Sequence, residues 1–440
     1  MGLGVEIEKM GHRGMGIARY QGKVIFVPLT APGDKAEVKV IRTHRDYDEA
    51  ELIQLLNPSP FRIDPPCPAF GQCGGCHLQH LSYSYQRSFK ENLFREMLIH
   101  YGDVAENRIK RMLNTPRELK YRSRIEAHVL WNNKPLLGFM ARGKNKVVPV
   151  NGCLLALPPI QSVLNEITRL LEKAKARGVT KVDIACDDSD DKVSLTLCSE
   201  RRPPTQVCKA LSTLASEIPH LRGLYLVQRE GDTFLPLWEG ESGSAGVSYA
   251  VPIDDSRQEI ILEAWPTVFR QVNPLVNRTL ISTALSWIQK CSPKRILDLY
   301  AGMGNFTLPL SFLAQEVVAV ELNPMAVENA KANAVRHSRK NIQWVNDSVK
   351  NALKSLVDSR KSFDLVILDP PRGGAKESLK EILTLSPERI IYISCEPATL
   401  ARDIRFLQKN GPYQVVRTQP LDMFPQTFHL ESITFLKKAG

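Results

Sequence analysis

No stretch of this sequence contains about 18 consecutive apolar residues, which argues against a conventional membrane-spanning helix. Residues 1–8 lack a basic segment followed by an apolar one, and Glu6 stands where an N-myristoylation signal has Ser or Thr. The nine Cys are an odd number, and without a secretory signal they do not predict a disulfide framework. We therefore expect a cytoplasmic protein without a membrane partner, whose clustered thiols bind metal or take part in catalysis.

The charge of the chain is concentrated in one segment. The 440 residues carry a net charge of +11, and residues 108–146 hold eleven Lys or Arg against two Glu, a balance of +9. Tyr121, Trp131 and Phe139 are interleaved with these charges. Cations follow phosphates and rings stack on bases, so the segment favours a nucleic-acid partner over the alternative of an ordinary solvated basic face. At 43% apolar and 24% charged residues, the chain is long enough for two or three soluble domains.

Residues 1–58 contain short alternating apolar segments separated by Gly and Pro. This pattern predicts a small β-barrel of about five strands. The arrangement resembles a TRAM domain, a small RNA-binding barrel that is appended to several RNA-modifying enzymes. From about residue 121 to 260 the chain mixes strands with two helices. The acidic turn at residues 187–191 lacks the Gly and the distal Glu of a calcium loop, so we expect it to be solvated.

Three Cys lie within ten residues, at Cys67, Cys73 and Cys76, and Cys153 follows a Gly turn further along the chain. Four thiolates suit either a tetrahedral zinc ion or an iron–sulfur cluster. The Cys-x5-Cys-x2-Cys spacing differs from the paired Cys-x2-Cys of a zinc ribbon. On the residues alone, both kinds of metal site remain open.

Residues 257–440 alternate regularly between strand and helix. This alternation predicts a parallel sheet that binds ligands at the carboxyl ends of its strands, as in S-adenosylmethionine (AdoMet) methyltransferases. The expected strands lie near residues 295–300, 316–321, 341–346, 363–369 and 389–395, with a final pair near 413–421 and 431–437.

A Gly-containing turn follows the first of these strands. In Tyr300-Ala-Gly302-Met-Gly304-Asn305, the two Gly let the backbone approach a ligand closely. Glu321 ends the next strand, where a carboxylate can bind both ribose hydroxyls of a nucleotide-like cofactor. The alternative is a tight turn in an ordinary α/β core.

The fourth and fifth strands end in residues that can carry chemistry. Asp369-Pro-Pro-Arg372 resembles the tetrapeptide of enzymes that methylate exocyclic amino groups, but Arg372 replaces the aromatic ring that stacks on the base. Cys395 follows the fifth strand, and Pro397 begins a helix whose dipole favours a thiolate; a buried core Cys is the alternative. Methylation at pyrimidine C5 requires such a thiolate, because C5 becomes nucleophilic only after addition at C6. Glu431, near the last strand, can remove the C5 proton, although a surface role is the alternative.

Together these segments resemble the iron–sulfur RNA 5-methyluridine methyltransferases over nearly the whole chain, TRAM barrel included. The nearest members of that family act on 23S ribosomal RNA. The segments that carry the resemblance are the four Cys, Phe269-Arg-Gln271-Val-Asn, Asp369-Pro-Pro-Arg, Ser394-Cys395-x-Pro397 and His429-x-Glu431.

The resemblance assigns roles by motif. It implies that Cys395 is the nucleophile and that the four clustered Cys bind a [4Fe–4S] cluster. It places AdoMet against Gln271, Tyr300, Asn305, Glu321 and Asp369, with Ser348 where a polar residue contacts the adenine. This chain departs from the family at Glu396, where Asn usually follows the nucleophile.

The predicted fold is α/β, with a Rossmann-like AdoMet methyltransferase domain at residues 257–440. A TRAM/OB-like β-barrel at residues 1–58 and a central α+β domain at residues 59–256 precede it, and about residues 80–115 are expected to pack on the catalytic domain. The central domain is expected to carry the cluster and to bind RNA. The predicted activity is methylation of uridine C5 in RNA, foremost 23S ribosomal RNA, by a monomer. The alternatives are 5-methyluridine formation in transfer RNA and C5 methylation of cytosine in RNA.

Overall fold

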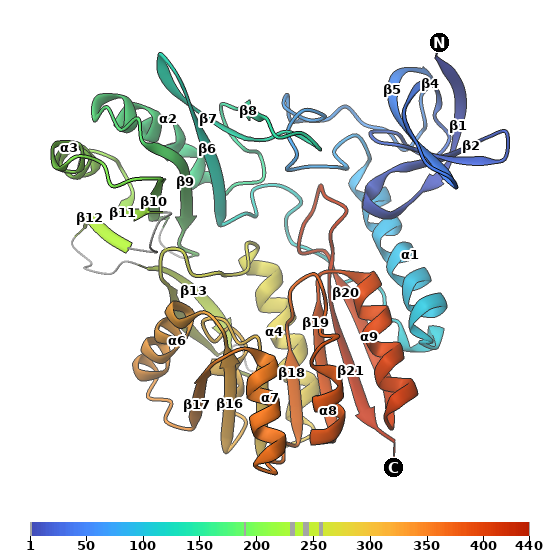
Figure 1. The fold of residues 1–440 in the computed structure, drawn as a ribbon, viewed down its shortest axis with the longest axis vertical. Helices are drawn as coiled ribbons and strands as arrows, with labels where there is room; N and C mark the ends of the chain where they lie inside the picture. The colour runs from blue at the N-terminus through green and yellow to red at the C-terminus, as the bar shows by residue number, and fades with distance from the viewer. Residues whose placement is uncertain (1, 189–190, 229–233, 241–245, 255–257, 440) are drawn as a thin grey trace.

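The computed structural model describes residues 2–188, 191–228, 234–240, 246–254 and 258–439. Figure 1 shows a barrel at the N-terminal end, a central sheet on the opposite side, and a layered α/β domain that carries the C-terminus. No helix in the described residues is long and apolar enough to cross a membrane.

The N-terminal strands close into a barrel in the order β1-β2-β3-β5-β4, which confirms the predicted five-stranded barrel. Alternate side chains such as Val5, Ile7, Val27 and Val38 fill its interior, because successive side chains of a strand point to opposite faces. The strands are β1 (Leu3–Met10), β2 (Gly16–Tyr20), β3 (Lys23–Val27), β4 (Lys35–Thr43) and β5 (Tyr47–Asn57), with a 3-10 turn at His12–Gly14.

Helix α1 (Tyr83–Gly102) runs from the barrel along the catalytic domain, beside helix α9 (Pro397–Asn410) (Figure 1). Phe94 and Leu98 of α1 belong to the same hydrophobic core as α9. After a 3-10 turn at Glu106–Arg108, residues 109–113 run parallel to an edge strand of the catalytic sheet, β20 (Tyr413–Leu421). The beginning of the basic segment therefore lies against the catalytic domain.

The central domain is a seven-stranded sheet in the order β12-β11-β10-β9-β6-β7-β8. The buried side chains of α2 recur at helical spacing from Ile160 to Leu171 and face this sheet. Its elements are β6 (Arg124–Asn132), β7 (Lys134–Met140), β8 (Val147–Pro149), α2 (Pro158–Lys173), β9 (Val179–Cys186), β10 (Val193–Ser199), α3 (Thr205–Ala215), β11 (Leu221–Gln228) and β12 (Phe234–Glu239).

The acidic turn after β9 is not solvated at its start, so that expectation was wrong for Asp187 and Asp188. Asp187 is 2% exposed and accepts a hydrogen bond from the Ser248 backbone at 2.5 Å. Asp188 accepts one from the Ala250 backbone at 3.3 Å. These carboxylates join the central sheet to the hairpin of β13 (Val247–Pro252) and β14 (Glu259–Ala264). Residues 189–190 of the turn lie outside the described residues.

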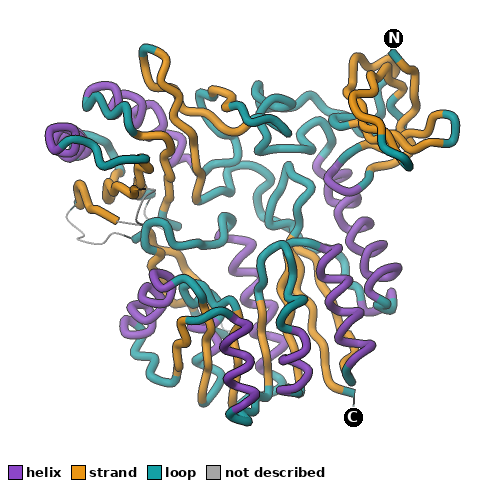
Figure 2. The backbone as a smooth tube through the Cα atoms, in the orientation of Figure 1, coloured by secondary structure: helices purple, strands orange, loops and turns teal. Residues whose placement is uncertain are grey.

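The catalytic sheet has the order β17-β16-β15-β18-β19-β21-β20, parallel except for β21, which confirms the Rossmann-like fold. Figure 2 shows helices packed around the strands of this sheet. One hydrophobic core contains residues of α4, α5 and α6, and a second contains residues of α7, α8 and α9. The elements are α4 (Pro274–Gln289), β15 (Arg295–Leu299), α5 (Thr307–Leu310), β16 (Glu316–Glu321), α6 (Pro324–Arg336), β17 (Ile342–Asn346), α7 (Val349–Asp358), β18 (Leu365–Leu368), α8 (Leu379–Leu385), β19 (Arg389–Ser394) and β21 (Glu431–Lys438).

The strand order reverses at β15, which pairs with β16 on one side and with β18 on the other. The connections after these strands diverge there and leave a crevice at their carboxyl ends. The loop between β20 and β21 reaches from this end of the sheet towards the N-terminal domains (Figure 1).

Candidate active site

A pocket of about 570 Å³ opens at the carboxyl ends of the catalytic strands. Both predicted catalytic residues line it, together with five of the six predicted cofactor residues. These residues are Gln271, Tyr300, Asn305, Glu321, Asp369, Cys395 and Glu431. The chain thus brings side chains from the ends of five strands and from the loop before α4 into a single cavity.

The turn after β15 forms one wall of the pocket. Gly302 and Gly304 both have positive φ, at 55° and 93°, and a Cβ on Gly304 would lie 2.2 Å from the Leu308 side chain. Glycine is therefore favoured at Gly304, where both the backbone angle and the space disfavour a side chain. The Gly302 backbone donates to Glu321 Oε2 at 2.9 Å, and the Asn323 backbone donates to Oε1 at 2.8 Å. The Glu321 carboxylate is consequently fixed at the end of β16.

Asn305 and Tyr300 are held by helices outside the turn. The Asn305 side-chain amide exchanges two hydrogen bonds with the Asn277 amide of α4, at 2.9 and 3.0 Å. The Tyr300 hydroxyl lies 3.3 Å from Ser378 Oγ. Both side chains are positioned before any ligand binds.

Cys395 and Glu431 are neighbours because β19 and β21 are antiparallel. Ser394 pairs with Ser432, and the Ser432 hydroxyl donates to the Ser394 carbonyl at 2.9 Å. The residue after Ser394 and the residue before Ser432 therefore lie side by side at the end of the sheet. This register, which no local sequence signal specifies, assembles the predicted nucleophile and base.

The electrostatics of Cys395 differ from the sequence prediction. Burial raises the pKa of its thiol to about 12, and the carboxylates of Glu431 and Asp369 add to the rise while Arg372 opposes it. A backbone hydrogen bond at Cys395 lowers the pKa of the thiol, the direction expected for a helix N-terminus, but burial outweighs this effect. Glu396 caps α9, accepting a hydrogen bond from the Ala398 backbone at 3.5 Å.

Glu431 is a buried carboxyl group with a free oxygen. The residue is 2% exposed, and its Oε1 has no hydrogen-bond partner among the described residues. Burial, followed by the nearby Asp369, raises the pKa of Glu431 well above its usual range. Burial also raises the pKa of Asp369 to about 7. A buried polar atom without a partner in a ligand-sized pocket indicates that a ligand supplies the partner.

Of the six predicted cofactor residues, Ser348 does not line the pocket as described. It is the N-cap of α7, where its Oγ accepts a hydrogen bond from the Asn351 backbone at 3.2 Å. Its contact with an adenine stays a prediction.

Sequence reasoning did not assign Phe269, Phe424 and His429 to the pocket, although all three line it. Phe269 is 68% exposed, and the rings of Phe424 and His429 lie 6.1 Å apart, edge to face. Burial and the neighbouring Arg372 lower the pKa of His429 to about 3, so its ring is neutral at physiological pH. For Phe424 and His429, the only available signal was their nearness to Glu431 in the sequence.

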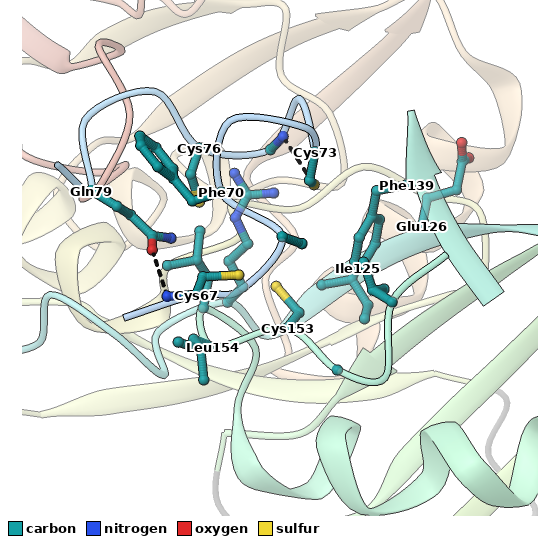
Figure 3. Close-up of a pocket in the computed structure, with 16 residues that line it drawn as sticks. Cys67, Phe70, Cys73, Cys76, Gln79, Ile125, Glu126, Phe139, Cys153 and Leu154 are labelled. Carbon is teal, nitrogen blue, oxygen red and sulfur yellow. Dashed lines mark hydrogen bonds between the residues drawn. The ribbon is translucent and has the colours of Figure 1, made fainter. Parts of the chain in front are cut away.

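A second cavity, of about 100 Å³, lies in the central domain (Figure 3). Cys67, Cys73, Cys76 and Cys153 all line it, and the nine Cys of the chain, all within the described residues, are free thiols. The Gly75 backbone donates to Cys73 Sγ at 3.4 Å, and Arg122 lines the same cavity. In the arrangement seen, the described residues contain no group of three or more His, Cys, Asp or Glu that could hold a metal ion. The thiols therefore surround a space and do not meet at a point.

The strand order and the pocket at the switch point define an AdoMet-dependent methyltransferase of the Rossmann-like class. A family model described as tRNA (uracil-5-)-methyltransferase matches residues 110–439, and a TRAM domain model matches residues 3–53. The chain belongs to the tRNA (uracil-5-)-methyltransferase family and is an AdoMet-dependent RNA uracil-5 methyltransferase.

Two relatives match almost end to end, and both are named 23S rRNA (uracil(1939)-C(5))-methyltransferase RlmD. The protein from Shewanella sp. (strain W3-18-1) is 31% identical over 445 residues, covering 99% of this chain and 95% of the relative. The protein from Photorhabdus laumondii is 30% identical over 436 residues, covering 99% and 96%. The crystal structure of the Pyrococcus abyssi tRNA (uracil-54, C5)-methyltransferase with S-adenosyl-L-homocysteine shares the fold. Its TM-score is 0.75 at 24% identity, covering 98% of this chain and 99% of that one.

Proposed function

We propose that this protein methylates C5 of a uridine in 23S ribosomal RNA, with Cys395 as nucleophile and Glu431 as base. The observation that carries the proposal is the adjacency of these two residues in the pocket that also holds the cofactor residues. The names of the full-length relatives favour 23S ribosomal RNA over transfer RNA. A ribosomal RNA substrate implies a cytoplasmic location.

The side chains that line the pocket can be assigned to different parts of the methyl donor. AdoMet supplies an electrophilic methyl group on a sulfonium cation. Glu321 would take the ribose hydroxyls, since its carboxylate is fixed at the end of β16. Asn305, Tyr300 and Gln271 would line the remainder of the cofactor site, and Asp369 would place a carboxylate near the cation. Cys395 would have a lower pKa beside this cation, which would offset the two carboxylates that raise the pKa.

The Cys395 thiol would first lose its proton to solvent, and the thiolate then adds to C6 of the uracil. The electron pair of the C5–C6 π bond makes C5 nucleophilic. After C5 has taken the methyl group, Glu431 removes the C5 proton. The electrons of the C5–H bond re-form the double bond and expel the Cys395 thiolate. Glu431 Oε1, which has no other partner among the described residues, is available to receive that proton.

The RNA would reach this pocket along the basic segment. Residues 109–113 follow β20 of the catalytic sheet, whereas β6 and β7, later in the same segment, belong to the central sheet. The segment therefore passes from one domain to the other, and its cations would contact the phosphates of a bound strand. A uridine swung out of an RNA loop can enter a pocket of this size.

The experiment that tests this function uses RNA from cells that lack the protein. Incubating 23S ribosomal RNA with the purified protein and methyl-labelled AdoMet should yield labelled 5-methyluridine after digestion to nucleosides. Transfer RNA from the same cells should remain unlabelled. Label in 5-methylcytidine would support C5 methylation of cytosine, and label confined to transfer RNA would contradict the choice of ribosomal RNA.

We further propose that Cys67, Cys73, Cys76 and Cys153 bind a [4Fe–4S] cluster. The donor set fits such a group, because four free thiols line one cavity together with the cationic Arg122. A cluster of four irons fills the space between four separated thiolates, whereas a single zinc ion requires them to meet.

Anaerobically purified protein should contain about four irons per chain and absorb visible light. Cys76→Ser is expected to lose most of that iron because one thiolate is missing. Cys208→Ser, on α3 and outside the cavity, is the matched control and should keep it. One zinc per chain in the parent protein would overturn the assignment.

A further inference from the structure

The loop between β20 and β21, residues 422–430, carries two aromatic side chains into the catalytic pocket and leads directly into Glu431. Phe424 and His429 line that pocket, and Glu431 is the first residue of β21. We call this segment the active-site loop. Its position decides how these side chains meet a base bound above Cys395.

Successive backbone carbonyls of the active-site loop accept hydrogen bonds from separate parts of the chain. Asn273 Nδ2 donates to the Met423 carbonyl at 3.2 Å, and the Tyr121 hydroxyl donates to that of Pro425 at 3.0 Å. The backbone N–H groups of His77 and Leu78 donate to the Gln426 carbonyl, at 2.9 and 3.1 Å. The loop is therefore fixed from the catalytic domain, the central domain and the Cys-rich segment at once.

Helix α1 provides the charged part of this arrangement. Lys90 Nζ donates to Asp422 Oδ1 at 2.7 Å and to the Phe424 carbonyl at 3.0 Å. The Tyr83 hydroxyl donates to the other Asp422 oxygen at 2.9 Å. Gln86, one turn before Lys90, exchanges two hydrogen bonds with Gln426, at 3.0 and 3.2 Å.

The Lys90 and Asp422 side chains are both 0% exposed. A buried ion pair is weak support for a fold, because removing two charges from water offsets most of their attraction. Apolar residues of similar volume often give equal or greater stability. The ion pair has, however, a directional effect that apolar residues lack, since it ties Asp422 and the Phe424 carbonyl to one point on α1.

We propose that Lys90 and Asp422 are positioning residues, which fix the active-site loop so that Phe424, His429 and Glu431 face the uracil. This inference rests on the proposed methylation of uridine. No described residue of α1 lines the catalytic pocket. The proposal nevertheless gives this helix a role in the rate of methyl transfer.

The test replaces the whole polar group, so that no charge or hydroxyl is left unpaired. In the triple variant Lys90→Met, Asp422→Leu, Tyr83→Phe, the Phe424 carbonyl still accepts from the Thr427 backbone and hydroxyl. The melting temperature is expected to stay equal or rise, and the Kd for AdoMet to stay within about twofold. The kcat for methyl transfer is expected to fall about 100-fold with the KM for RNA unchanged, because a small misplacement of reacting groups has that effect.

The matched control is the double variant Lys331→Met, Glu328→Gln. It removes an ion pair of the same length, 2.7 Å, from the exposed side of α6. It should transfer methyl groups at the parent rate. A triple variant that folds and also transfers at the parent rate would overturn the proposal, whereas a parent protein that methylates no RNA would overturn the proposed function.

If the triple variant does not fold, a single variant tests whether the position of the active-site loop controls kcat. Tyr121→Phe removes the hydroxyl that donates to the Pro425 carbonyl and that also contacts the Arg122 side chain. It should lower kcat about fivefold, the effect of one ordinary hydrogen bond, with the melting temperature and AdoMet affinity near those of the parent. An unchanged kcat would show that the loop does not need these contacts.

Discussion

Cys395→Ala is expected to abolish methylation of the RNA and the formation of any covalent protein–RNA complex. Without the thiol nothing adds to C6, and C5 of the uracil does not become nucleophilic. The loss of kcat should be at least about 10⁴-fold, as for other covalent nucleophiles. Single-turnover transfer of a labelled methyl group, together with a denaturing gel for the complex, measures both effects.

The fold of this variant should be intact, because Ala replaces a half-buried thiol that is uncharged at neutral pH. AdoMet affinity should therefore match that of the parent protein. Cys291→Ala, at the end of α4 and outside the described lining of the pocket, is the control and should keep full activity. Residual transfer by Cys395→Ala near the parent rate would exclude Cys395 as the nucleophile.

Much of the fold could be predicted because its signals are local. The alternation of apolar residues in residues 1–58 and the repeated strand–helix pattern after residue 257 reflect the periods of strands and helices. The turn at Gly302 and Gly304 has positive φ angles that favour glycine, and this preference is visible in the sequence. Cys395 and Glu431 could be proposed as partners because the chemistry at C5 needs both.

Burial and distant contacts could not be predicted in the same way. The charges of the turn at Asp187 predict exposure to solvent, but the hairpin of β13 and β14 covers this residue. The dipole of α9 is a local property, whereas the rise in the pKa of Cys395 depends on burial and on carboxylates brought in by β18 and β21. Lys90 and Asp422 lie 332 residues apart, and no pattern within α1 distinguishes this lysine from an exposed one.

The raised pKa values in the pocket mean that Cys395 and Glu431 must each lose a proton to solvent before the proposed reaction. Burial favours the thiol form of Cys395 and the neutral form of Glu431. A carboxylate with a raised pKa is a stronger base once it is ionised, and the positive charge of the methyl donor favours that ionisation. The cation would therefore favour ionisation of both the proposed nucleophile, Cys395, and the proposed base, Glu431.

Glu431→Gln is expected to trap the reaction after methyl transfer. The amide has the shape and neutrality of the protonated acid that burial favours, so the free energy of unfolding should change by no more than about 1 kcal/mol. Cys395 can still add to C6, but no base removes the C5 proton, and the methylated RNA stays bound to the protein. Turnover should fall about 10²- to 10⁴-fold.

A labelled complex should persist in a denaturing gel. The control is Glu388→Gln, an exposed residue beyond the opposite end of β19, which should behave as the parent. If Glu431→Gln releases methylated RNA at the parent rate, another group removes the proton, and the free oxygen of Glu431 serves a different purpose.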